Sequence, residues 1–191
     1  MHIASFFVVA LAFAIATMLL LVRCASASQV RLSHGLVVAL VLALVHVVLY
    51  WLGFAVGNLL RFEGDNDPMA FARQNAFVFL GLAVIVVVRM LLPYLRRNPR
   101  LPHFDISSNG PMLAMAIASG VNVGLVGIGM GFACVDADIH LIIWPLLVLT
   151  FLLGYFGIMF GRRGVALRPR RWMVLSCLLL LAVAIAAVVN G

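Results

Sequence analysis

Charged residues are scarce in this sequence, and lysine is missing altogether. Asp, Glu and Arg together make up 10% of the 191 residues, whereas hydrophobic residues make up 65% and the mean hydropathy is +1.20. Soluble domains are about a quarter charged and about half apolar. The composition therefore excludes a soluble catalytic domain and predicts an integral membrane protein.

The sequence also has few acidic residues and few cysteines. The net charge is +7, and the arginines lie between apolar runs, so anionic lipid headgroups are the expected partner and nucleic acid is not. Cys24, Cys134 and Cys177 are widely spaced and fit no metal or redox motif. We expect them to be small apolar fillers, and we expect no cofactor apart from a transported divalent cation.

Long apolar runs are what the sequence has instead. Each is long enough to cross a hydrocarbon core of about 30 Å as a helix. A helix is required because it is the only structure in which an isolated segment makes all its backbone hydrogen bonds internally. Ala25-Ser26-Ala27 resembles a signal-peptide cleavage site, but no basic residue precedes the first run, so we expect that run to be retained. The six predicted spans are Ile3–Val22, Gly35–Leu60, Ala76–Leu95, Pro111–Ala133, Ile139–Gly161 and Trp172–Val189.

Arginines are unevenly distributed over the connections between these spans. The first, third and fifth connections hold ten arginines, whereas the second and fourth hold two together with five acidic residues. The positive-inside rule places the arginine-rich connections in the cytoplasm and both termini outside, which predicts a multi-pass protein of a bacterial inner membrane. The external acidic residues, expected to be solvated loop charges, are Glu63, Asp65, Asp67, Asp136 and Asp138.

A weak internal repeat divides the chain into two halves. Ala14-Ile15-Ala16-Thr17 in the first span is matched by Ala116-Ile117-Ala118-Ser119 in the fourth, and a Gly-x-x-x-Gly pair closes the second and fifth spans. Because each half has three spans, the halves are predicted to be inverted in the membrane, a plan typical of secondary transporters. The chain is then one transmembrane domain, residues 1–191, with repeat one at about 1–95, a cytoplasmic loop at about 96–110 and repeat two at about 111–191.

Two polar side chains fall at similar depth inside spans. His46 lies near the middle of the second span and Asn122 near the middle of the fourth, where a polar group is costly unless it faces protein or water. They could form a shared substrate site, or each could make one hydrogen bond between helices. Arg89, inside the third span, can extend its side chain to the cytoplasmic interface.

The fourth span is rich in glycine around Asn122. Five glycines lie between Gly120 and Gly131. They allow close helix packing, and they also favour a helix that bends and exposes backbone carbonyls.

These residues resemble the MntP-type manganese efflux pumps, small six-helix proteins of the lysine-exporter-like group. The resemblance is sharpest over Ala116–Phe132, where the family shows a pattern like A-I-A-T-S-L-D-A-M-A-V-G-V-G-L-A-F. Arg89-Met90 and Gly161-Arg162 match further family turns. The resemblance implies an all-α membrane protein whose six transmembrane helices form two inverted three-helix repeats.

The family's carboxylates are missing from this chain. The positions where the family has acidic residues correspond to Met18, His46 and Asn122. Manganese is a hard cation that favours oxygen ligands, and neutral ligands would leave its double charge uncompensated. The resemblance therefore implies the architecture more firmly than it implies manganese as the substrate.

Two functions remain open from the sequence. One is a small secondary transporter that exports a divalent, manganese-like metal ion or another small solute through a midplane site. The other is a non-transporting paralogue that acts as a membrane interaction or assembly subunit. An enzyme is not expected, because no second histidine or carboxylate lies in a span. Nothing in the sequence indicates an oligomeric state.

The candidate site residues follow from these arguments. The substrate-binding candidates are His46, Asn122, Ser119 and Met18, of which His46 and Asn122 are the candidate metal ligands. Arg89 is a further candidate, and the candidate gating or packing residues are Gly53, Gly57, Gly120, Gly124, Gly127, Gly157 and Gly161.

Overall fold

The computed structural model describes residues 3–27, 31–62, 68–95, 104–133, 140–165 and 168–190. All regular secondary structure in these ranges is α-helical, and each helix is long and apolar enough to cross a membrane. The predicted six-helix membrane fold is thereby confirmed. The helices are α1 (Ile3–Ala27), α2 (Leu32–Leu60), α3 (Pro68–Leu95), α4 (Asn109–Ala133), α5 (His140–Arg162) and α6 (Pro169–Asn190).

The helices extend beyond several of the predicted limits. Helix α3 begins at Pro68 rather than Ala76, because proline is suited to the first turn of a helix, where no backbone N–H is required. Arg73 is consequently a helical residue and not a loop residue. Several residues used in the topology argument lie outside the described ranges, namely Glu63, Asp65, Asp67, Arg96, Arg97, Arg100, Cys134, Asp136 and Asp138.

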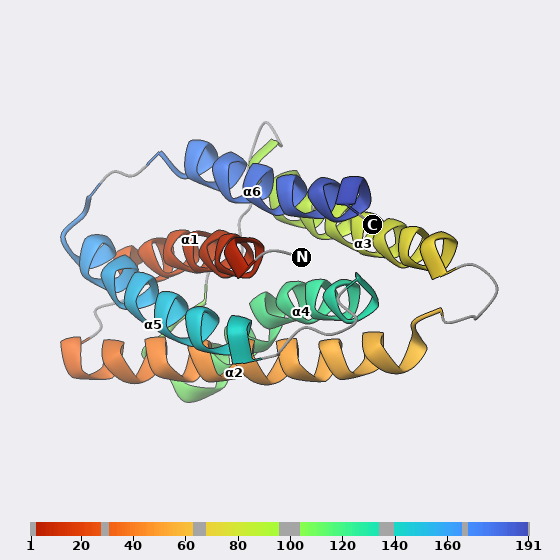
Figure 1. Ribbon diagram of the computed structural model, residues 1–191. Helices are drawn as coiled ribbons and strands as arrows, with labels where there is room; N and C mark the ends of the chain where they lie inside the picture. Colours follow the sequence, from red (N-terminus) through yellow and green to blue (C-terminus); the bar gives the residue numbers. More distant parts are fainter. Residues whose placement is uncertain are drawn as a thin grey trace.

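The helices form three layers, with α1 and α4 in the middle (Figure 1). Helix α1 packs against α5 and α6, α4 packs against α2 and α3, and the outer layers are the pairs α2–α5 and α3–α6. This set of pairs is unchanged when α1 is exchanged with α4, α2 with α5 and α3 with α6. Two equivalent three-helix halves would give this pattern, although the inverted relation of the halves stays a prediction.

Glycines bring α2 and α4 into backbone contact. A Cβ atom on Gly53 or Gly57 would collide with the α4 backbone at Gly124 and Ile128. From the other side, a Cβ on Gly127 would lie 2.5 Å from the carbonyl oxygen of Tyr50. Side chains at these positions would force the helices apart, so the glycines set the distance between α2 and α4.

The same kind of contact joins α5 to α1. A Cβ on Gly157 would lie 2.6 Å from the carbonyl oxygen of Met18, and one on Gly161 would collide with the carbonyl oxygen of Val22. The glycine pair that ends α2 and the glycine pair that ends α5 thus each pack on a middle-layer helix. This correspondence is a structural counterpart of the sequence repeat.

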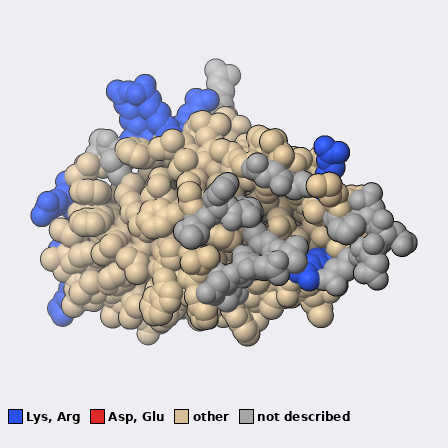
Figure 2. Space-filling model, in the orientation of Figure 1, with Lys and Arg blue, Asp and Glu red and all other residues tan. Residues whose placement is uncertain are grey.

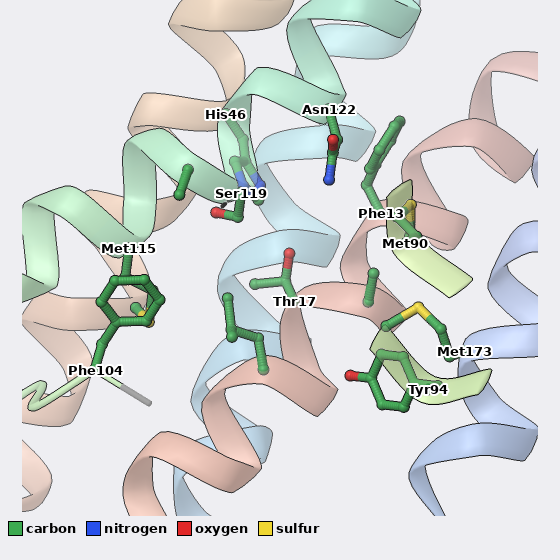
Figure 3. A pocket seen from close by; sticks show the side chains of 13 residues that line it. Phe13, Thr17, His46, Met90, Tyr94, Phe104, Met115, Ser119, Asn122 and Met173 are labelled. Carbon is green, nitrogen blue, oxygen red and sulfur yellow. Dashed lines mark hydrogen bonds between the residues drawn. The ribbon is translucent and has the colours of Figure 1, made fainter. Parts of the chain in front are cut away.

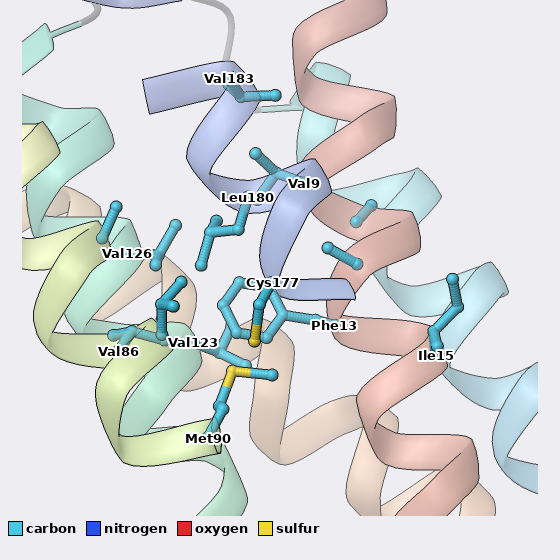
Figure 4. Close-up of a cluster of buried hydrophobic side chains, with 14 of the residues drawn as sticks. Val9, Phe13, Ile15, Val86, Met90, Val123, Val126, Cys177, Leu180 and Val183 are labelled. Carbon is cyan, nitrogen blue, oxygen red and sulfur yellow. The ribbon is translucent and has the colours of Figure 1, made fainter. Parts of the chain in front are cut away.

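Apolar side chains fill the space between α1, α3, α4 and α6. Figure 4 shows Phe13, Val86, Val123 and Leu180 meeting there from four different helices, and all four are buried. The protein interior and the surrounding lipid are both apolar, so the hydrophobic effect that drives the folding of soluble bundles does not favour one over the other. The arrangement of this core is therefore determined by side-chain packing.

The outer surface is uncharged over most of the face seen in Figure 2. Arginines lie toward the two ends of the bundle, with more of them toward the end where α2 begins. Large apolar side chains such as Trp144, which is 62% exposed, and Leu178, which is 58% exposed, point outward. An apolar belt between charged ends is the surface that a bilayer-spanning protein requires.

We predict that both termini face the outside of the cell. The ends of α1, α3 and α5, which precede the arginine-rich connections in the sequence, lie at one end of the bundle (Figure 1), and the positive-inside rule assigns that end to the cytoplasm. An alkaline phosphatase fusion after Gly191 should be active, and a cytoplasm-dependent reporter at the same site should be inactive. The reverse pair of results would invert the orientation.

Candidate functional site

A cavity of about 300 Å³ lies in the middle layer, between α1 and α4. It lies mainly in the half of the bundle where α1 and α3 end, because its residues come from the middle of α1, the first half of α4, the end of α3 and the start of α6. Its wall is mostly apolar, with a few polar and sulfur-containing side chains (Figure 3). The lining residues are Phe13, Ala16, Thr17, Leu20, His46, Met90, Tyr94, Phe104, Met115, Ala118, Ser119, Asn122 and Met173.

His46 reaches this cavity from α2 and is held by Ser119 of α4. The His46 Nε2 and Ser119 Oγ atoms are 3.0 Å apart, and the Ser119 hydroxyl donates to the carbonyl oxygen of Ala116 at 3.1 Å. When the single hydroxyl proton is used in that bond, Ser119 accepts from His46, and the neutral imidazole carries its proton on Nε2. The other ring nitrogen, Nδ1, is then a lone-pair acceptor.

Within the described part of the chain, the His46 Nδ1 atom has no hydrogen-bond partner, although the side chain is only 1% exposed. The Oδ1 atom of Asn122 is likewise buried without a partner among the described residues. Buried polar atoms in proteins are nearly always hydrogen-bonded, so an unpaired one calls for an explanation. Two unpaired lone-pair atoms on residues lining one cavity are suited to a ligand that accepts electron pairs or donates hydrogen bonds.

Other polar groups complete the cavity. The Thr17 hydroxyl and the Asn122 amide both point into the space between α1 and α4 (Figure 3). The Arg23 guanidinium, near the end of α1, lies close to the Tyr94 side chain on α3, and Asp105 follows the lining residue Phe104 in the sequence.

No Asp or Glu is among the described residues that line the cavity. Within the described ranges, no group of three or more His, Cys, Asp or Glu side chains is placed to hold a metal ion. Sulfur is better represented, because three of the lining residues are methionines, and the Cys24 thiol lies 3.7 Å from the Met115 sulfur. The donors that the cavity offers are neutral hydroxyl, amide, imidazole and thioether groups.

The structure brings together three of the four predicted substrate-binding residues. His46, Ser119 and Asn122 line the cavity, whereas Met18 is not a lining residue. Its neighbour Thr17 lines the cavity in its place, because one residue step on a helix turns the side chain by about 100°. Met18 instead lies where α1 meets Gly157 of α5.

Arg89 lies elsewhere in the structure. Its side chain is exposed on α3 and is not among those that line the cavity. Sequence reasoning also missed Thr17, although the repeat aligned it with Ser119, and it missed the methionines, which carry no motif.

Comparison with known proteins identifies the family. Residues 29–188 match the family model described as "Putative manganese efflux pump", which covers α2 to α5 and nearly all of α6. No curated protein and no solved structure matches the chain. Because the match spans most of the chain, the protein belongs to this manganese efflux pump family.

Proposed function

We propose that the protein is a small secondary transporter that exports a metal ion, or another small solute, from the cytoplasm through the cavity between α1 and α4. The family is one of efflux pumps, which supports transport as the activity. The observation that carries the proposal is the cavity itself, with the unpaired Nδ1 of His46 and Oδ1 of Asn122 on residues of its wall. Polar groups inside a membrane span line a substrate pathway more often than they face lipid.

The position of the cavity supports this direction of transport. It lies between the two middle-layer helices, which the repeat relates to each other, and transporters with repeats bind their substrates at that interface. Under the predicted orientation, it occupies the cytoplasmic half of the bundle. An exporter must take up its substrate from that side, so the conformation is one suited to loading.

The uncharged wall favours a second candidate function. A divalent ion would meet no carboxylate among the described lining residues, so its charge would be poorly stabilised. A paralogue that has stopped transporting and serves as a membrane interaction subunit would tolerate such a wall. The two candidates differ in whether any ion crosses the membrane.

A strain that lacks the gene tests the proposal. We expect it to accumulate, and to be sensitive to, at least one ion of the series Mn²⁺, Zn²⁺, Co²⁺, Ni²⁺, Fe²⁺ and Ag⁺. Expression of the intact gene should restore growth and lower the cell-associated metal measured by mass spectrometry. Unchanged sensitivity to every ion, together with no flux of any of them into proteoliposomes containing the purified protein, would favour the non-transporting subunit.

A further inference from the structure

Methionine side chains from three helices line the cavity. Met90 of α3, Met115 of α4 and Met173 of α6 all line it, and each is less than 10% exposed. Figure 3 shows the Met173 side chain extending from α6 toward the space between α1 and α4, with Met115 on another part of the wall. Methionine often serves as an adaptable core filler, so the sulfurs alone do not indicate a ligand.

His46 supplies an independent observation. Its Nδ1 atom is buried and has no hydrogen-bond partner among the described residues, while Ser119 contacts the other ring nitrogen; with the proton on that nitrogen, Nδ1 carries a lone pair. A histidine whose second nitrogen is held by a hydrogen bond is the usual arrangement of a metal-binding imidazole. His46 therefore brings one oriented imidazole to a wall that otherwise offers thioethers and neutral oxygens.

The charge and the softness of these donors select against manganese. Thioether and imidazole donors favour Cu(I), whereas hard ions such as Mn²⁺ favour carboxylate, carbonyl and water oxygens. A monovalent ion also brings half the charge of a divalent one into a cavity whose described lining residues include no Asp or Glu. Both considerations point to the same class of ion.

We infer that the ion that this cavity accepts is a soft monovalent metal ion of the Cu(I) class, for which the His46 imidazole on one wall and the thioethers of Met90 and Met173 on the opposite wall are the donors. The inference rests on the proposed function, since it names the substrate class of that same cavity. It replaces the divalent ion implied by the family with one that matches the donors of this chain.

Silver(I) is the probe, because it shares the softness of Cu(I) and is not oxidised in air. The measurement is equilibrium dialysis of the purified full-length protein in detergent against Ag⁺ and, separately, Mn²⁺, with bound metal determined by mass spectrometry. Thiols also bind Ag⁺, so all proteins carry Cys24→Ala, Cys134→Ala and Cys177→Ala. Gel filtration verifies that every variant remains folded and monodisperse.

We expect the protein to bind about one Ag⁺ per chain and to bind Mn²⁺ at least tenfold more weakly. Met90→Leu with Met173→Leu, which keeps side-chain volume while removing two sulfurs, should weaken Ag⁺ binding at least tenfold. The matched control, Met69→Leu with Met159→Leu, also removes two sulfurs but at positions outside the cavity, and it should bind as the parent does.

Four results would overturn the inference. Equal loss of Ag⁺ binding in the control pair would mean that the sulfurs act without regard to position. Unchanged binding in the Met90 and Met173 variant would mean that these methionines are only packing residues. If the protein bound Mn²⁺ but not Ag⁺, and His46→Ala abolished the Mn²⁺ binding, the soft-ion inference would be refuted and the proposed function would stand. If the protein neither bound nor transported any of the ions, both the inference and the proposed function would be refuted.

Discussion

Replacing Gly57 with leucine is expected to prevent most of the protein from folding to a stable bundle. A Cβ at this position collides with the backbone of Ile128 on α4, and backbone atoms cannot move aside as a flexible side chain can. Overpacking a well-packed core costs about 1–3 kcal/mol, occasionally more. A collision with backbone belongs at the upper end of that range, so we expect a loss of about 3 kcal/mol or more.

Gly81 provides the matched control. It is also a helical glycine, on α3, but a Cβ there meets nothing within 4 Å, so Gly81→Leu should change stability by no more than about 0.5 kcal/mol. The measurement is the temperature at which the detergent-solubilised protein loses its monodisperse gel-filtration peak. If Gly57→Leu and Gly81→Leu lose that peak at the same temperature, α2 and α4 are not held by backbone contact as described.

Replacing His46 with alanine is expected to reduce metal export at least a hundredfold. The substitution removes the imidazole with the unpaired buried nitrogen and also leaves Ser119 without its α2 partner. His46→Glu should restore part of the export and shift its preference toward harder ions such as Mn²⁺, because it returns a carboxylate to the cavity. Flux into proteoliposomes, normalised to the amount of folded protein, measures both effects.

His140 is the control histidine, since it is exposed at the start of α5 and does not line the cavity. His140→Ala should transport as the unmodified protein does. A different pattern would identify His46 as only a helix-packing residue: His46→Ala would then lower the yield of folded protein, but the protein that folds would transport at the original rate. That outcome would end the assignment of His46 to the substrate site.

The candidate site follows only partly from the sequence. His46 and Asn122 are conspicuous because polar residues are costly inside spans, and the structure places both on one cavity. Met18 is predicted to be a substrate-binding residue from the family resemblance, and a resemblance in sequence does not show which side of the helix faces the cavity. Thr17, one residue away, lines the cavity instead. The second half of the repeat contained this information, since Ser119 is the counterpart of Thr17.

The sequence by itself determined the six spans, the unequal distribution of arginine and the family. These features depend on local composition, because a segment in lipid must satisfy its own backbone hydrogen bonds whatever its neighbours are. The glycine pairs in α2 and α5 can also be seen in the sequence, but the sequence does not show that they pack against α4 and α1.

Only the tertiary structure decided which side of each helix faces the cavity. In a soluble bundle an apolar stripe marks the buried face, but here the lipid-facing and protein-facing sides are both apolar, so no stripe separates them. Met90, Met115 and Met173 look like any other apolar residue along their helices, and packing alone brings their side chains to one cavity with His46. The chemistry of that cavity is therefore a property of the arrangement of the helices.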